Sequence, residues 1–184
     1  TQVIDVALAH FNNRYHIIFQ NENDKRPRVA TAPSVDGPWS FIGDGQIKML
    51  MPDCQENGLK HENFQFVYID GRWRLISSDY SPRGAFIYTM AESGEKPEHW
   101  QTWIDGRKMA VPPEEWNKRE VDNAPALMDW REHDGYFYLI YCGKNDIRKD
   151  DFVGPGSRKP WARGWNRLGL IRSKDPENWC LPGK

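Results

Sequence analysis

The sequence predicts an all-β fold of the β-propeller type, with about three four-stranded antiparallel blades. Three observations predict this fold class: one template occurs three times along the 184 residues, tight turns separate alternating apolar runs, and aromatic and turn-forming residues are abundant. The chain holds nine Trp, seven Tyr and eight Phe, together with 15 Gly and 13 Pro. This composition is typical of a turn-rich β protein.

Each copy of the template has the same order of features. An acidic residue opens a short apolar strand, a tight turn leads into an aromatic-rich strand, and a further strand ends in Ser and is followed by Trp. The acidic residues are Asp5, Glu62 and Asp122. We therefore expect one propeller domain or fragment over residues 1–184, with units at about 1–50, 57–110 and 118–184.

The first unit runs over strands 5–11, 14–20 and 28–34, with a turn at Asn12-Asn13 and the template Trp at position 39. Both central residues of a type I′ turn need positive φ, which Asn and Gly adopt readily. The first two strands should therefore form an antiparallel hairpin.

The second unit turns at Asp70-Gly71 and continues over strands 72–77 and 85–93 to Trp100. The third unit turns at Asp134-Gly135 and continues over strands 136–141 and 168–173 to Trp179. We expect two-residue hairpin turns in both units.

Charge and apolar patterning exclude several classes of partner. The chain carries 25 Lys plus Arg against 26 Asp plus Glu, so it has no basic footprint for nucleic acid. Its longest apolar run, 136–142, is far shorter than the roughly 20 residues of a membrane-spanning helix. Three widely spaced cysteines predict neither a zinc site nor a disulfide framework.

The innermost strands of a propeller surround one axis, so residues at their starts converge at one end of the channel. Asp5, Glu62 and Asp122 would then share a pocket, provided that they occupy matched positions. The alternative is that each acid merely begins a strand.

Six of the tryptophans divide into two groups. The template residues Trp39, Trp100 and Trp179 recur at one point of every unit, so we expect them to pack in the core. Trp130, Trp161 and Trp165 lie in connecting segments and are candidates for stacking on sugar rings, with burial as loop anchors as the alternative.

With these residues in view, the sequence resembles the five-bladed β-propeller glycoside hydrolases of families 43, 32 and 117. The resemblance rests on Asp5-Val-Ala-Leu followed by Tyr15-His-Ile-Ile-Phe, on His61-Glu62 leading into Gly71-Arg-Trp73, and on Ala124-Pro-Ala126 leading into a Gly-aromatic strand. It implies that the three visible blades belong to a fold of five.

The resemblance also implies catalytic roles. Asp5 resembles the second-blade aspartate that tunes and orients, and Glu62 resembles the third-blade general acid. In the family 117 pattern His61 would be the acid instead. The Asp-Pro segment that carries the general base in such enzymes is not in this chain. The chain is accordingly expected to be a fragment, a partner of another chain, or a reduced relative.

We therefore expect a glycosidase that hydrolyses plant or algal oligosaccharides by acid/base catalysis. The alternatives are a carbohydrate-binding propeller without catalysis and a protein-interaction propeller. No metal site or cofactor is expected, although a structural calcium ion would be compatible with the fold. An open blade edge predicts a partner chain or further blades that cover it. By resemblance, the location is periplasmic or secreted.

Overall fold

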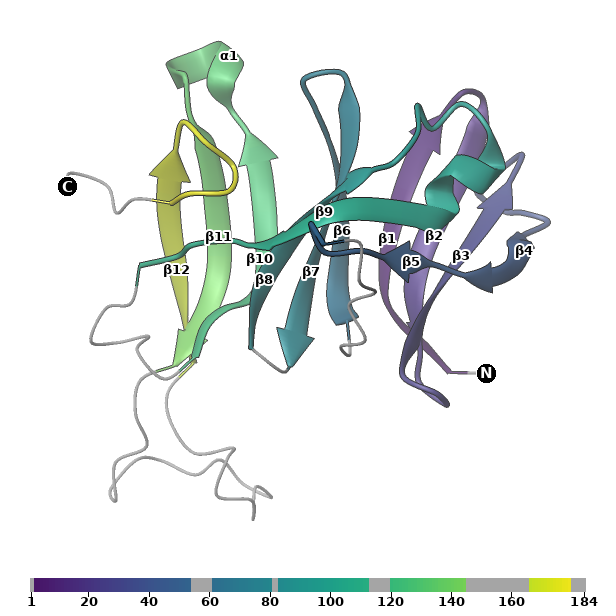
Figure 1. The fold of residues 1–184 in the computed structure, drawn as a ribbon, viewed down its shortest axis with the longest axis horizontal. Helices are drawn as coiled ribbons and strands as arrows, with labels where there is room; N and C mark the ends of the chain where they lie inside the picture. Colours follow the sequence, from purple (N-terminus) through teal and green to yellow (C-terminus); the bar gives the residue numbers. More distant parts are fainter. Residues whose placement is uncertain (1, 54–60, 81–82, 113–119, 145–165, 180–184) are drawn as a thin grey trace.

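The structure, a computed structural model, describes residues 2–53, 61–80, 83–112, 120–144 and 166–179. It confirms the all-β, propeller-type fold class: three separate sheets stand side by side along the molecule (Figure 1). We call these sheets blade 1, blade 2 and blade 3 in chain order.

Blade 1 is a four-stranded antiparallel sheet in the order β1-β2-β3-β4. Its strands are β1 (Val3–Phe11), β2 (Arg14–Asn21), β3 (Arg26–Ala32) and β4 (Ser40–Gln46). From Val6 to His10 of β1, buried Ala7 and Ala9 alternate with exposed residues, and together with Ile18 of β2 they pack against blade 2.

Blade 2 has the strand order β5-β9-β8-β7-β6. Four antiparallel strands form its body: β6 (His61–Ile69), β7 (Arg72–Tyr80), β8 (Arg83–Met90) and β9 (Thr102–Lys108). The short strand β5 (Lys48–Met49) arrives from blade 1 and pairs in parallel with β9. A 3₁₀ helix, η1 (Pro97–Gln101), joins β8 to β9.

Blade 3 shows three strands in the described residues rather than the expected four. They are β10 (Glu120–Asp129), β11 (Phe137–Lys144) and β12 (Asn166–Ser173), paired antiparallel in that order. The four-residue helix α1 (Arg131–Asp134) joins β10 to β11. None of the helices that the structure describes is long and apolar enough to cross a membrane.

Two of the three expected hairpin turns are confirmed. Asn12 and Asn13 have φ of 50° and 59°, and Asp70 and Gly71 have φ of 51° and 77°. These left-handed values at both central positions close two-residue turns between β1 and β2 and between β6 and β7.

The expected two-residue turn at Asp134-Gly135 is wrong. Helix α1 takes the preceding four residues, and Gly135 ends it in the left-handed conformation with φ of 83°. Its backbone N–H donates to the Arg131 carbonyl at 3.0 Å. Gly135 is therefore a helix C-cap rather than the second residue of a hairpin turn.

Two apolar clusters hold the blades together. The first fills the seam between blades 1 and 2 and includes Ala7, Ile18, Val29, Leu75 and Trp103. The second fills the seam between blades 2 and 3 and includes Ile76, Ile87, Leu127, Leu139 and Ile171. Each blade therefore packs face to face on the next.

The template tryptophans behave as packing residues in blades 2 and 3. Trp100 and Trp179 are almost fully buried. The indole N–H of Trp100 donates to the Gly94 carbonyl and that of Trp179 to the Pro176 carbonyl, each at 2.9 Å. Trp39 of blade 1 is half-buried.

Candidate functional site

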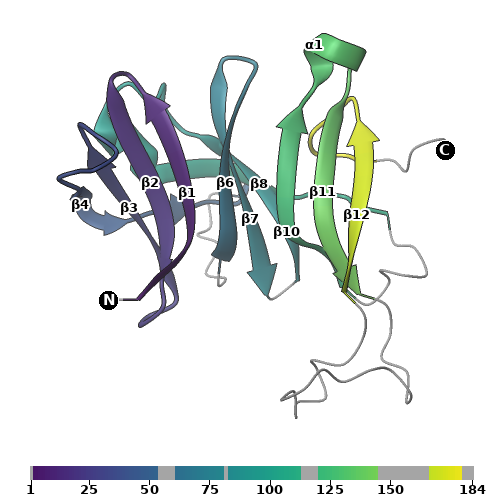
Figure 2. The same cartoon turned by 180° about the vertical axis from the view of Figure 1, so that it is seen from behind.

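The first strands of the three blades, β1, β6 and β10, lie next to one another (Figure 2). An open pocket of about 440 Å³ lies where these strands meet. Its lining comes from all three strands: Asp5, Val6, Asn63, Phe64, Gln65, Pro125 and Ala126. The pocket is thus the meeting point of the three blades near the starts of their first strands.

Each first strand is irregular at this pocket. Strand pairing shifts in β1 between Ile4 and Ala7, in β6 between Glu62 and Gln65, and in β10 between Asn123 and Ala126. At each shift, two residues of the first strand lie opposite one residue of the second strand, which is the geometry of a β-bulge. The bulges cover residues 5–6, 63–64 and 124–125, and these residues supply most of the pocket lining.

The bulges also correct the expected alignment of the repeats. Asp5 matches Asn63, because each lies at the start of its bulge and seven residues before its hairpin turn. The two residues share a left-handed backbone, with φ of 55° and 53°. Glu62 therefore corresponds to Ile4, and the expectation that the three acids occupy matched positions is wrong.

Asp5 is a half-buried carboxylate at the pocket wall. Burial raises the pKa of its carboxyl group above the ordinary value, and the negative charges of Glu62 and Glu22 act in the same direction. The backbone N–H of Asn63 donates to the carboxylate, and this bond together with Lys25 opposes the rise in pKa. Asp5 therefore holds a proton more readily than an exposed aspartate does.

Glu62 and His61 lie next to each other at the start of β6 but differ in environment. Glu62 is half-buried and close enough to Asp5 for their charges to interact. His61 is only 2% exposed, with its Nδ1 atom 3.3 Å from the Ser77 hydroxyl and its ring edge-on to Tyr88. This contrast follows from the alternation of side chains along a strand.

The remaining predicted catalytic residue, Asp122, lies in β10, but its side chain is outside the described residues. Strand β10 has a further shift in pairing between Glu120 and Asn123, so Asp122 lies in an irregular stretch that has no counterpart in β6. The structure thus brings Asp5 and Glu62 together and leaves the surroundings of the Asp122 carboxylate untested.

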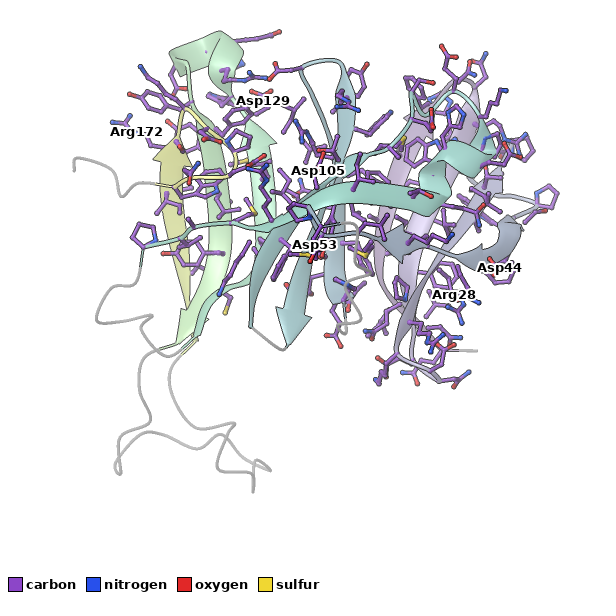
Figure 3. All side chains as sticks on the ribbon, viewed as in Figure 1. Arg28, Asp44, Asp53, Asp105, Asp129 and Arg172 are labelled. Atoms are coloured by element: carbon purple, nitrogen blue, oxygen red, sulfur yellow. The ribbon has the colours of Figure 1, made fainter. Side chains whose placement is uncertain are left out.

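Of the three candidate sugar-stacking tryptophans, the structure describes only Trp130. Trp161 and Trp165 lie outside the described residues. Trp130 is 48% exposed, lies tilted against the His133 ring with ring centroids 4.3 Å apart, and follows the end of β10. Figure 3 labels its neighbour Asp129 near α1, at the end of the strand away from the pocket. At about 3.3 Å per residue, Trp130 lies roughly 13 Å along the strand from Ala126.

Sequence reasoning missed Asn63 and Gln65 as pocket residues. Besides its backbone bond to Asp5, Asn63 donates from Nδ2 to the Ser78 hydroxyl at 3.3 Å. The Gln65 amide donates to the Leu127 carbonyl at 2.8 Å and accepts from the Leu127 N–H at 2.7 Å. The shared spacing of seven residues from the hairpin turn was the signal that could have identified Asn63.

A second side-chain amide ties blade 1 to the start of β6. Gln20 is fully buried and donates from Nε2 to the His61 carbonyl at 3.0 Å. The backbone on both sides of the pocket is therefore held by glutamine side chains from neighbouring blades. Within the described ranges, no three His, Cys, Asp or Glu residues cluster closely enough to hold a metal ion.

Comparison with solved structures identifies the architecture. The chain is similar to an endo-1,4-β-xylanase from Bacteroides thetaiotaomicron, with 13% identity and a TM-score of 0.64 over 100% of this chain and 54% of the other. It is also similar to the exo-β-1,3-galactanase 1,3Gal43A from Clostridium thermocellum, with 16% identity and a TM-score of 0.60 over 97% of this chain and 34% of that one.

A third similar structure is the arabinanase Arb43A from Bacillus subtilis, with 17% identity and a TM-score of 0.56 over 94% of this chain and 51% of the other. The resemblance to family 43 β-propeller glycoside hydrolases is thus confirmed at the level of fold. The chain spans between 34% and 54% of the length of these three solved structures. No family model and no curated protein matches the sequence.

Proposed function

We propose that this chain forms part of a glycoside hydrolase that acts on plant or algal oligosaccharides, with its proton donor at the pocket between the blades. The observation that carries the proposal is the pair of interacting carboxyl groups, Asp5 and Glu62, beside an open pocket. Glycoside hydrolysis needs one group that protonates the leaving oxygen and another that activates water or attacks the sugar.

Glu62 is the proposed proton donor. Its neighbour His61 is buried against Ser77 and Tyr88, a position from which an imidazole has little access to a ligand in the pocket. Asp5 lies close enough to Glu62 for their charges to interact, which places a second carboxyl group beside the proposed donor. Asp5 is proposed to tune and orient this proton.

The roles of the remaining candidate residues are proposed because the sequence resembles the family 43 glycoside hydrolases. Asp122 is a further catalytic candidate in β10, and Trp161, Trp165 and Trp130 are candidate sugar-binding residues. The fold of the solved neighbours supports a carbohydrate ligand, since one of them is described with β-1,3-galactotriose. A periplasmic or secreted location is proposed on the same basis.

The test compares Glu62→Gln, His61→Asn and the unmodified chain on activated aryl glycosides and on unactivated oligosaccharides of xylose, arabinose and galactose. Glu62→Gln should slow the unactivated substrates far more than the aryl glycosides, because a good leaving group needs little protonation. His61→Asn should change the ratio between the two substrate classes much less.

Three outcomes would contradict parts of the proposal. The reverse ranking would transfer the proton donor to His61. Binding of oligosaccharides in calorimetry without any turnover would favour a carbohydrate-binding propeller. Activity that is equal in all three proteins would remove Glu62 from the site.

A further inference from the structure

A buried glutamine connects the two chain segments that carry the carboxyl pair. Gln20 of β2 lies opposite Ile4 of β1, the residue before Asp5. Its side chain is fully buried and crosses to blade 2, where Nε2 donates to the His61 carbonyl at 3.0 Å. His61 is the residue before Glu62. The Gln20 amide therefore fixes how far the Glu62 segment lies from the Asp5 segment.

The two peptide groups that flank Glu62 are both held from blade 1. The His61 carbonyl belongs to the planar peptide group that also contains the Cα atom of Glu62. The next peptide group contributes the Asn63 N–H, which donates to the Asp5 carboxylate. Gln20 thus holds the first group and Asp5 holds the second. A change in the backbone torsion angles of Glu62 would break at least one of these two hydrogen bonds.

The side chain of His61 anchors the same strand start from within blade 2. Its Nδ1 atom is 3.3 Å from the Ser77 hydroxyl of β7, and its ring lies edge-on to Tyr88 of β8. Ser77 and Tyr88 are both fully buried. His61 therefore supports the strand on which Glu62 lies, although it does not line the pocket.

The stability of the seam does not by itself explain a glutamine at position 20. The Oε1 atom of Gln20 is buried and has no hydrogen-bond partner among the residues that the structure describes. A buried acceptor without a partner lowers stability, so this side chain gains one hydrogen bond and loses another. Residues that carry such a local cost are expected at functional sites. The amide is therefore better explained by the carbonyl that it holds.

We propose that Gln20 is a positioning residue whose amide holds the backbone before Glu62 and so keeps the Glu62 carboxyl group beside that of Asp5. Gln20 does not line the pocket and acts through the His61 carbonyl. The catalytic consequence rests on the proposed function, in which Glu62 donates the proton and Asp5 orients it. The placement of Glu62 is a property of the folded chain and is measured without turnover.

Gln101 supplies a matched control in the same seam. Its Nε2 atom donates to the Ile42 carbonyl at 3.0 Å, so it also joins blades 1 and 2 through an amide and a backbone carbonyl. Gln101 ends η1, and Ile42 lies in β4, at the opposite edge of blade 1 from β1 (Figure 2). Loss of the Gln101 amide therefore weakens this seam away from Asp5 and Glu62.

The experiment titrates the Asp5 carboxyl group of the 184-residue chain by NMR, with and without Glu62→Gln. This pair of titrations is repeated in Gln20→Met, in Gln20→Asn and in the control Gln101→Met. Gln20→Met keeps the length of the side chain and removes the donor. Gln20→Asn keeps an amide that is one methylene shorter, and it serves as the second test where Gln20→Met does not fold. Circular dichroism first establishes that each variant is folded.

In the unmodified chain and in Gln101→Met, Glu62→Gln should lower the pKa of Asp5, because the Glu62 charge raises it. In Gln20→Met and Gln20→Asn the same substitution should lower the Asp5 pKa by clearly less, since the released backbone lets Glu62 turn away. A residue that merely stabilises the seam would leave this shift equal in all backgrounds, and that result would overturn the proposal. An Asp5 pKa that does not respond to Glu62→Gln in the unmodified chain would overturn it as well.

Turnover of unactivated oligosaccharides separates this proposal from the proposed function. Gln20→Met should lower kcat by up to roughly 100-fold with little change in KM, as expected for a displaced catalytic group, and Gln101→Met should change neither. A rise in KM at unchanged kcat would contradict the positioning role. No turnover in the unmodified chain, together with the smaller Asp5 shift in the Gln20 variants, would contradict the proposed function and uphold the role of Gln20.

Discussion

The carboxylate of Asp5 accepts a hydrogen bond from the backbone N–H of Asn63, and this bond joins blade 1 to blade 2 at the wall of the pocket. Asp5 and Asn63 hold the same place in their blades, at the start of a bulge with a left-handed backbone. The bond therefore connects two equivalent positions, and it sets the Asp5 carboxylate beside Glu62.

The raised pKa of Asp5 predicts a pH-dependent effect of Asp5→Asn on stability. A carboxyl group whose pKa is higher in the folded protein contributes stability below its unfolded pKa, and that contribution is lost as pH rises through the folded pKa. At pH 7 the Asp5 charge thus opposes folding, and Asp5→Asn should raise the melting temperature. The gain should disappear below about pH 4, since aspartate in an unfolded chain has a pKa near 3.9.

Asp129→Asn is the matched comparison with the opposite sign. The hydrogen bond from Arg131 lowers the pKa of the Asp129 carboxyl group. Its contribution to stability is present above the unfolded pKa and is lost as pH falls through the folded pKa, so Asp129→Asn should lower the melting temperature at pH 7 and lower it less at pH 3.5. Scanning fluorimetry at pH 3.5 and pH 7 checks both signs, and equal shifts for the two variants would contradict the assignment.

The backbone of Asn63 predicts which substitutions the pocket tolerates. At φ of 53°, a β-branched residue is strained by about 1–3 kcal/mol, whereas glycine is not. Both Asn63→Gly and Asn63→Val lose the side-chain bond to Ser78, so the loss of that bond cancels when the two variants are compared. Urea unfolding should show Asn63→Val as the less stable variant, and equal stability would contradict the bulge geometry.

Local signals in the sequence predicted the hairpins better than they predicted the site. The turns at Asn12-Asn13 and Asp70-Gly71 depend on residues that adopt positive φ wherever they occur, so their chemistry is readable locally. Gly135 also adopts positive φ, but the same residue type ends a helix as readily as it closes a turn. For this reason the local sequence at Asp134-Gly135 does not distinguish a hairpin turn from a helix end.

The relationship between the repeats follows from spacing rather than from residue type, because Asp5 and Asn63 each lie seven residues before a hairpin turn whereas Glu62 lies eight residues before it. Matching Asp5 to Glu62 ignores a slip of one residue, and such a slip moves a side chain to the other face of a strand. The contact of Gln65 with Leu127 bridges two blades and 62 residues, and no local pattern encodes it. The blades were therefore predictable from the sequence, whereas the exact composition of the pocket was not.

The Gln65 amide predicts a stability cost at the seam between blades 2 and 3. Its two hydrogen bonds satisfy the backbone N–H and the backbone carbonyl of Leu127, as a neighbouring strand would. Gln65→Leu leaves both backbone groups without this partner, at a cost of about 1–3 kcal/mol for each group that stays out of contact with water. Gln46→Leu, at an exposed residue of β4, is the control and should stay within roughly 0.5 kcal/mol in urea unfolding. A cost for Gln65→Leu no larger than that of the control would contradict the role of this amide.

His16 predicts acid sensitivity of the seam between blades 1 and 2. Its ring is 2% exposed and stacks flat on Trp100, with centroids 4.0 Å apart and an interplanar angle of 2°. Burial, assisted by the positive charge of Arg14, lowers the pKa of His16 to about 4. The imidazole is therefore neutral in the folded protein at pH values at which it takes up a proton in the unfolded chain.

A lowered histidine pKa gives a contribution to stability that is present above the unfolded value near 6.5 and is lost as pH falls toward 4. A difference of this size between the folded and unfolded pKa of His16 corresponds to a free energy on the order of 3 kcal/mol.

His16→Phe keeps an aromatic ring for stacking on Trp100 and removes the titrating group. The free energy of unfolding of His16→Phe should therefore fall less between pH 7 and pH 4.5 than that of the unmodified chain. His10→Phe, at an exposed residue of β1, should retain the original pH dependence. If His16→Phe and the unmodified chain lose the same stability in urea titrations at the two pH values, the histidine is not the group that makes this seam sensitive to acid.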